Sequence, residues 1–359
     1  MSEGIIHSRG DLVGGRYKVL SHIGAGGMQE VYLGADELLG REIALKVPKN
    51  ESAAKRFQRS AIVSARVNHA NVAKTLDYVE ADGRAYLIEE YIEGNDLGWL
   101  LKERFSALDP MMAGFVLHRL ARGLAASHHA GVVHRDLKPS NVMSVGGETL
   151  RDVKITDFGI AKMAEEEMVE AVEGGDDSLT ASQTAIGALP YMAPECINAI
   201  KDAGTPADVW SLGAMVFELI SGKKPFGSGL KAVPAILKGE LPPLPGNLSS
   251  RQFKPLGEAI YKVIQRCLQL DPSARITADQ LVEECEKLCY PAALREFGNV
   301  KRMNNSYWGF IQAENGGDLF FHIQSLFGTH RVAVGDRVWC ARYSGGGADR
   351  AFPVLRVKT

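Results

Sequence analysis

The sequence predicts an α+β protein with two lobes, followed by a small all-β module. Three features of the 359 residues lead to this prediction. Short apolar strands and glycine turns fill the region up to about residue 91, and apolar residues at helical spacing follow to about residue 288. From about residue 297, short strands again alternate with Asn- and Gly-rich turns. This length suits two or three domains, or one large bilobed domain with an appendage.

The first half is predicted to be mostly strand. Residues 15–47 contain three apolar segments separated by the glycine-rich turn at 24–27 and the Leu39-Gly40 turn. A helix is expected over residues 53–67, and two further strands over 74–80 and 85–91. A small lobe built mainly from strands therefore precedes the helical region.

The second half is predicted to be helical. Apolar residues recur at helical spacing over 111–130, 207–221, 256–269 and 278–288. Residues 163–185 interrupt this pattern with an acidic, glycine-containing stretch, which predicts a solvated loop. A strand-rich lobe followed by a larger helical lobe implies a cleft between the two.

Composition limits the compartment and the partners of the chain. Net charge is −2 and apolar residues make up 45%, which gives no overall attraction to nucleic acid or membrane. The five cysteines match no zinc spacing, so we expect free thiols in a reducing compartment. No apolar run is long enough for a signal core or a membrane span. The sequence therefore predicts a cytoplasmic protein without membrane contact.

A glycine turn and a lysine in the strand-rich half indicate a phosphate site. Gly24 and Gly26 lie between two strands, with Val31 next, and Lys46 follows Ala44 on the third strand. Glycines without side chains allow a backbone turn to fold over ATP phosphates, and a lysine on that strand can reach the α- and β-phosphates. Alone, this pattern is weak, because glycines also form ordinary tight turns.

Three later motifs are far more specific. They are His134-Arg135-Asp136-Leu137-Lys138-Pro139-Ser140-Asn141, then Asp157-Phe158-Gly159, then Ala193-Pro194-Glu195. In order and spacing, residues 12–292 resemble Hanks-type serine/threonine protein kinases of the bacterial branch. The resemblance implies a small lobe over about 12–91 and a large lobe over about 95–292.

The resemblance also implies roles for single residues. Asp136 would accept the proton of a protein serine or threonine hydroxyl, and Lys138 would neutralise the transferring phosphoryl group. Asn141 and Asp157 would hold Mg²⁺, and Arg275 would pair with Glu195. ATP and Mg²⁺ are the expected cofactors. The expected ATP-site residues are Gly24, Gly26, Val31, Ala44, Lys46, Glu89, Glu90 and Tyr91.

The sequence departs from the family pattern at three informative places. The helix after Lys46 usually supplies a glutamate for that lysine, but Ser60 occupies the expected slot. Glu89 lies where an apolar residue usually closes the back of the ATP pocket, so it either anchors Lys46 or points to solvent. Ala188 replaces a usual threonine. These departures keep an alternative open: a nucleic-acid-binding regulator on an inactive or ATP-sensing pseudokinase fold.

The loop between Asp157 and Glu195 carries candidate phosphorylation sites. They are Ser178, Thr180, Ser182 and Thr184, of which Thr184 is preferred because it is nearest Gly187. A phosphate there would pair with Arg135, and self-association would allow autophosphorylation. The alternative is that these hydroxyls are only solvated.

The C-terminal module contains two aromatic strands. Because side chains alternate along a strand, Trp308, Phe310, Phe320 and His322 would form one platform if the strands are neighbours. Residues 297–359 resemble cold-shock domains, which implies a five-stranded OB-type barrel that binds single-stranded RNA or DNA. Nine Lys and Arg against five Asp and Glu after residue 292 favour this partner. The alternative is that the aromatic residues dock on the kinase lobe or on another protein.

Overall fold

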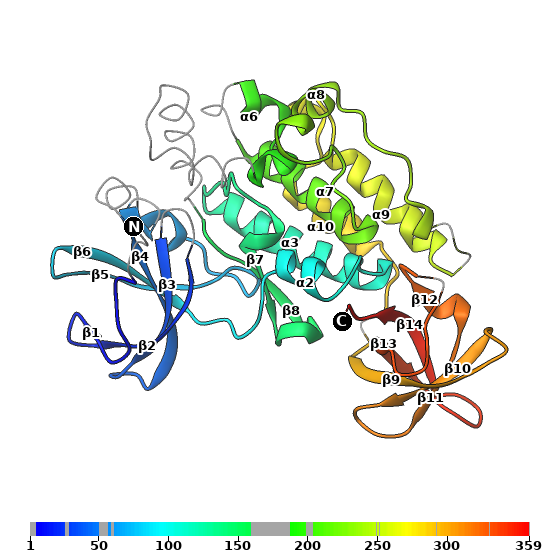
Figure 1. The fold of residues 1–359 in the computed structure, drawn as a ribbon. Helices are drawn as coiled ribbons and strands as arrows, with labels where there is room; N and C mark the ends of the chain where they lie inside the picture. The colour runs from blue at the N-terminus through cyan, green and yellow to red at the C-terminus, as the bar shows by residue number, and fades with distance from the viewer. Residues whose placement is uncertain are drawn as a thin grey trace.

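A computed structural model describes residues 5–25, 29–49, 57–58, 61–158, 187–198, 204–248, 250, 252–291, 293–329 and 331–358. In chain order these residues form a strand-rich lobe, a helical lobe and a β-barrel (Figure 1). The helical lobe lies between the other two, and the barrel packs beside α2 and α9. The two-lobed α+β prediction and the appended β-module are both confirmed.

One antiparallel sheet forms most of the small lobe. Its strand order is β1-β2-β3-β4-β6-β5. The strands are β1 (Leu12–Val13), β2 (Tyr17–Ala25), β3 (Gln29–Asp36), β4 (Arg41–Pro48), β5 (Thr75–Ala81) and β6 (Arg84–Glu90). Side chains of β3 alternate between buried and half-buried, as expected of a sheet with one face on a core. Of the helix expected over 53–67, the structure describes residues 57–58 and 61–64 as helical.

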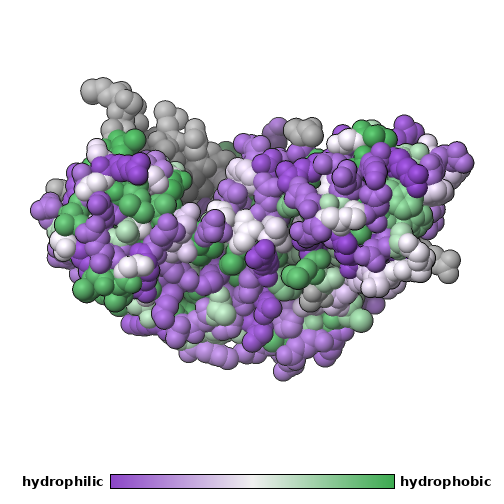
Figure 2. Space-filling model, turned by 90° about the horizontal axis from the view of Figure 1, so that it is seen from below, coloured by the Kyte–Doolittle hydropathy of each residue, from purple (hydrophilic) through white to green (hydrophobic). Residues whose placement is uncertain are grey.

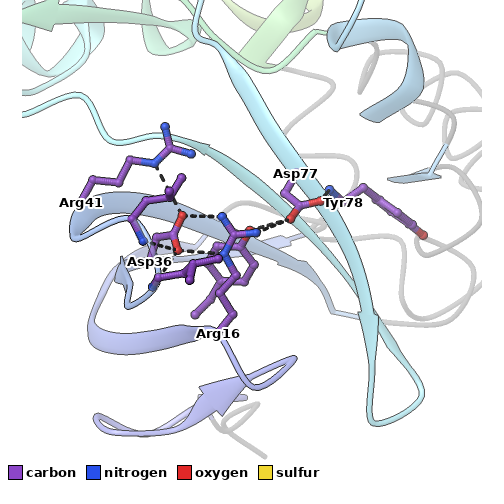
Figure 3. A network of polar contacts seen from close by, with 8 residues as sticks. Arg16, Asp36, Arg41, Asp77 and Tyr78 are labelled. Atoms are coloured by element: carbon purple, nitrogen blue, oxygen red, sulfur yellow. Dashed lines mark hydrogen bonds and ion pairs between the residues drawn. The ribbon is translucent and has the colours of Figure 1, made fainter.

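A polar network links three strands of this sheet (Figure 3). Arg16 binds both oxygens of Asp36 at 2.8 Å and lies 3.4 Å from Asp77. Asp77 also accepts a hydrogen bond of 2.6 Å from the Tyr17 hydroxyl. The Arg16 guanidinium lowers the pKa of Asp36 to about 2. The network therefore links β2, the end of β3 and β5 through charge-assisted bonds.

The helical lobe is organised around α3 and α7. Its helices are α2 (Leu97–Glu103), α3 (Pro110–His129), α6 (Pro194–Asn198), α7 (Thr205–Ser221), α8 (Val233–Lys238), α9 (Lys254–Cys267) and α10 (Ala278–Glu286). Asp109 begins α3 by accepting the backbone N–H groups of Met111 and Met112. The four helices predicted from spacing are present, with ends shifted by one or two residues. Arg275 binds Glu195 through two bonds of 2.5 and 2.7 Å, as predicted.

The C-terminal module is a closed barrel. Its strands are β9 (Arg295–Asn304), β10 (Trp308–Ala313), β11 (Asp318–His322), β12 (Leu326–Phe327), β13 (Arg337–Tyr343) and β14 (Arg350–Arg356). The order is β11-β10-β9-β13-β14-β12, and a parallel pairing of β11 with β14 closes the sheet. Leu319 and Phe321 point into the barrel core, so the predicted alternation along β11 is confirmed.

The barrel shares a hydrophobic core with the helical lobe. Trp339 of β13 is fully buried against Phe105, with ring centroids 5.0 Å apart. Phe253, just before α9, contacts both Phe327 and Phe352 of the barrel. Docking on the helical lobe therefore uses a different set of aromatic residues from the predicted platform.

A buried ion pair joins the same two units. Arg295 of β9 lies 2.9 Å from Asp109, the residue that begins α3, and neither side chain is more than 4% exposed. The Arg295 guanidinium also lies 4.9 Å from the centre of the Trp339 ring. The barrel is thus attached at the start of a central helix of the helical lobe.

The surface carries no single dominant apolar band on its underside. Figure 2 shows this face as mostly hydrophilic, with separate small hydrophobic patches. Within the described parts of the chain, no helix combines the length and apolar character needed to cross a bilayer.

Candidate functional site

A cavity of about 550 Å³ lies between the strand-rich and helical lobes. It gathers residues that are far apart in the sequence, including Gly24, Val31, Ala44, Lys46, Glu89, Glu90, Tyr91, Asp136, Lys138, Asn141 and Asp157. Its size suits a small-molecule ligand. Every expected ATP-site residue that the structure describes lines it; Gly26 lies outside the described residues.

Two carboxylates hold the Lys46 ammonium group. Lys46 Nζ lies 2.6 Å from Glu89 Oε2 and 2.8 Å from Asp157 Oδ1. Ala44 of β4 is paired with Glu89 of β6, so Lys46 and Glu89 are diagonal neighbours on one face of the sheet. Both residues are only 5% exposed. The alternative that Glu89 points to solvent is wrong, because its carboxylate faces Lys46; Ser60 lies outside the described residues.

Charge in this cluster is strongly coupled. Burial by itself would lower the pKa of Lys46, but the charges of Asp157 and Glu89 raise it, so the ammonium form is held. Burial raises the pKa of Glu89, opposed by Lys46. The pKa of Asp157 is lowered, because Lys46 and the Gln29 amide outweigh the burial effect. Gln29 donates to Asp157 Oδ1 at 3.1 Å, a contact that the sequence did not predict.

The loop before η1 (Pro139–Asn141) positions Asp136. Asp136 Oδ2 accepts a hydrogen bond of 2.7 Å from Lys138 Nζ and one of 3.0 Å from the Asn141 amide. Asn141 also donates to the Asp136 backbone carbonyl at 2.8 Å. The carboxylate is therefore fixed in one orientation at the mouth of the cavity, beside a positive charge.

Asp208 of α7 holds the loop that carries Asp136 through hydrogen bonds to its backbone. Its fully buried carboxylate accepts the backbone N–H groups of His134 at 2.8 Å and Arg135 at 2.7 Å. It also lies 2.9 Å from the His128 ring. These bonds stabilise the left-handed backbone of Arg135, whose φ is 68°. The sequence places Asp208 on a predicted helix but does not reveal this role. The signal it offers is a carboxylate within a largely apolar helical segment.

The residues expected to bind Mg²⁺ provide suitable atoms. Asn141 and Asp157 both line the cavity, and hard divalent cations prefer such carboxylate and amide oxygens. Asn141 uses its amide nitrogen for Asp136, so its oxygen is the atom that suits a cation. Around Lys46, two carboxylates surround one ammonium group, which leaves excess negative charge. The donor set therefore fits one Mg²⁺ ion.

The four candidate phosphorylation residues, Ser178, Thr180, Ser182 and Thr184, lie outside the described residues. Ala188, at the position of the usual threonine, directly precedes a short 3₁₀ helix, Leu189–Tyr191.

The aromatic platform exists on the barrel surface. Phe310 of β10 is paired with Phe320 of β11, and Trp308 with His322, as the alternation predicted. The rings of Trp308, Phe310 and Phe320 lie 5.8 to 5.9 Å from one another, and all three are half-buried. The guanidinium of the exposed Arg302 lies 4.4 Å from the Phe310 ring centre. An adjoining groove of about 480 Å³ includes Phe320, His322 and Arg350.

Comparison with known proteins covers the two lobes. The family model described as protein kinase domain matches residues 17–285, which ends before the barrel. Serine/threonine-protein kinase PknA of Mycobacterium tuberculosis is 38% identical over 251 residues, which cover 67% of this chain and 55% of that protein. Serine/threonine-protein kinase PrkC of Bacillus subtilis is 30% identical over 292 residues, covering 79% of this chain and 42% of PrkC.

A third relative is the probable serine/threonine-protein kinase PknB of Corynebacterium glutamicum, 34% identical over 226 residues, 60% of this chain and 33% of that protein. The chain therefore spans between a third and just over half of the length of these relatives.

Proposed function

The chain belongs to the protein kinase domain family, and we propose that it is a serine/threonine kinase that transfers the γ-phosphoryl group of ATP to protein hydroxyls. One observation carries the proposal: Lys46, Asp136, Asn141 and Asp157 converge on one cavity between the lobes. Positioning and charge stabilisation supply most of the catalysis in such transfers.

Each residue has a role that its contacts support. Asp136 accepts the proton of the substrate hydroxyl, and Lys138, 2.7 Å away, offsets charge on the transferring group. Lys46 binds the α- and β-phosphates as a fixed positive charge. Asn141 and Asp157 would hold Mg²⁺, which when bound offsets the negative charge of the phosphates.

We propose further that Glu89 takes the place of the usual helix glutamate. The ion pair with Lys46 lies within the sheet, between β4 and β6, so its geometry is fixed by strand register rather than by a helix. A lysine held in this way is pre-organised for phosphate binding without a change in helix position.

The test is transfer of label from γ-labelled ATP to a protein acceptor with Mg²⁺. We expect transfer by the full chain and its loss in Asp157→Asn, while Asp279→Asn, an exposed carboxylate on α10, keeps the wild-type rate. No transfer at all, or equal transfer by wild type and Asp157→Asn, which would show that the label is not transferred by this site, would favour the alternative of a regulator without catalysis. Mapping of phosphate in the same sample tests autophosphorylation at Ser178, Thr180, Ser182 and Thr184, and hence the need for self-association.

A second function is proposed for the barrel, with residues 12–292 as the catalytic unit and 297–359 as the appended unit. The observation that favours single-stranded RNA or DNA is the cluster of three rings at the surface, with Arg302 on one of them. Bases stack on such rings with about 1–3 kcal/mol each, and cationic side chains attract the backbone.

Binding is measured by fluorescence anisotropy of a labelled single-stranded RNA and a DNA of the same sequence. We expect salt-sensitive binding and a loss of roughly 5- to 150-fold for each ring removed in Trp308→Ala and Phe320→Ala. Leu294→Ala, a highly exposed position that the platform does not include, serves as the control. Unchanged affinity in a variant that carries both Trp308→Ala and Phe320→Ala would leave protein docking as the platform's role.

A further inference from the structure

Two further grooves continue from the nucleotide cavity toward the barrel. The first, of about 480 Å³, shares Lys138 and Ser140 with the cavity. The second, of about 390 Å³, shares Ser106 and Lys358 with the first and reaches the barrel residues Thr329 and Arg356. Because neighbouring spaces share wall residues, the three lie in a row from the catalytic loop to the barrel surface, and this row is called the path below.

Lys358, which follows the last barrel strand, forms part of the wall of both grooves. Its backbone N–H donates to the Arg104 carbonyl at 2.8 Å. Its ammonium group donates to the carbonyls of Leu101 at 2.6 Å and Lys102 at 3.1 Å, near the end of α2. An ammonium group has three N–H donors, and these carbonyls take two of them. The barrel thus places a fixed positive charge beside the kinase cleft.

The groove next to the catalytic loop has an excess of positive charge. Lys102, Lys138, Lys224 and Lys358 line it, and Glu218 is its one carboxylate among the described lining residues. Burial raises the pKa of Glu218, and the Tyr191 hydroxyl donates to this carboxylate. Lys138 is balanced by Asp136, and the exposed Lys102 by Glu103. Lys224 lies close enough to Glu218 for its charge to oppose the rise of that pKa, so Glu218 offsets part of the charge of Lys224. The net positive charge of the groove therefore comes from Lys358 and from the remaining part of Lys224.

We propose that the barrel and the helical lobe together bind an extended acidic segment of the protein substrate. The proposal rests on the kinase function proposed above. A peptide fits better than nucleic acid, because the path starts at Lys138 and Ser140, where the acceptor hydroxyl must lie. The aromatic side chain on this groove, Tyr191, is buried and so offers no platform for bases.

The test uses the full chain and two fluorescent peptides of about 16 residues, which reach about 50 Å when extended. Each carries one serine; one has Asp and Glu on both sides, and the other has Asn and Gln at the same positions. Equilibrium binding is followed by anisotropy, and phosphate transfer is measured with the same peptides. We expect tighter binding of the acidic peptide, with a preference that shrinks as salt is added.

Single substitutions then assign the effect to the groove. Lys358→Met keeps the aliphatic stem and should reduce the acidic preference about two- to fivefold, and Lys224→Met, on the kinase lobe, by a similar factor. Lys358→Arg, which keeps the positive charge, should show the same acidic preference as the wild type. Lys238→Met, an exposed lysine of α8 outside both grooves, should keep it. Thermal melting of each variant separates a loss of charge from a loss of fold.

Equal binding of both peptides, or an unchanged preference in both methionine variants, would overturn the proposal. Displacement of the acidic peptide by a single-stranded oligonucleotide whose own binding needs Lys358 would also overturn it, in favour of nucleic acid. Transfer to both peptides without preference would support the kinase function and refute the groove as a site for acidic peptides. Selective binding of the acidic peptide without phosphate transfer would support the groove as a peptide-binding site and count against the kinase function.

Discussion

Replacing Glu89 tests how Lys46 is held. Glu89→Gln keeps the size of the side chain and removes its charge, whereas Glu89→Met also removes the acceptor. In the wild type, Lys46 Nζ has carboxylate oxygens at 2.6 and 2.8 Å, and both Lys46 and Glu89 are 5% exposed. Bonds to charged groups contribute about 1.5–3 kcal/mol and neutral ones about 0.5–1.5 kcal/mol.

These values set the expected loss of activity. Weakening one bond by about 1–1.5 kcal/mol should lower kcat/KM for ATP roughly 5- to 12-fold in Glu89→Gln. Removing the bond should lower it roughly 12- to 150-fold in Glu89→Met. Burial raises the pKa of Glu89. As the pH is lowered, this carboxylate therefore becomes protonated at a higher pH than an ordinary glutamate does. The wild-type rate should then approach that of Glu89→Gln.

The assay is steady-state phosphate transfer to a peptide acceptor at varied ATP concentration. Glu42→Gln, an exposed carboxylate on the same strand as Lys46, is the matched control and should keep the wild-type value. Thermal melting shows whether each variant is folded. Wild-type kcat/KM in both Glu89 variants would refute the reasoning, as would an equal loss in Glu42→Gln.

Two further predictions concern stability. Arg295→Met should lower the free energy of unfolding in urea by about 3 kcal/mol, because it leaves the buried Asp109 without its cation. This value is the lower end of the range of about 3–5 kcal/mol for breaking a buried ion pair. We expect the lower end because Asp109 Oδ2 and Arg295 Nη1 have no hydrogen-bond partner within the described structure. Adding Asp109→Asn should recover most of this loss, and a recovery near zero would contradict the account. In acid unfolding, the pKa of Asp36 is lowered to about 2 by Arg16, so its stabilising effect is full above its ordinary pKa near 3.8 and is lost as the pH falls through about 2. Asp36→Asn should therefore be less stable at neutral pH and should lose less stability over that acid window, whereas parallel pH profiles would contradict the assignment.

Much of the fold was predictable because it depends on local patterns. Apolar alternation located the strands of the small lobe, and helical spacing located α3 and α7 to within two residues. The catalytic residues were predictable for a similar reason. Asp136, Lys138 and Asn141 lie within one short motif, so their proximity follows from the chain itself.

Contacts that depend on the packing of distant segments were not predictable. The Lys46–Glu89 pair requires a specific register of β4 on β6, and the sequence left its alternative open. Trp339 looks like any apolar strand residue, although it is buried against Phe105 of the kinase lobe. A single sequence does not reveal which face of the barrel packs against which helix of the kinase lobe.

The most direct test of the account is whether label from the γ-phosphate of ATP reaches serine or threonine on a protein, and whether that depends on Asp136. Asp136 is fixed by Lys138 and Asn141 at the mouth of the cavity. The account predicts phosphoserine or phosphothreonine with wild-type protein and Mg²⁺, and a rate roughly 10²- to 10⁴-fold lower in Asp136→Asn. Equal labelling by wild type and Asp136→Asn, or phosphate only on other residue types, would contradict it.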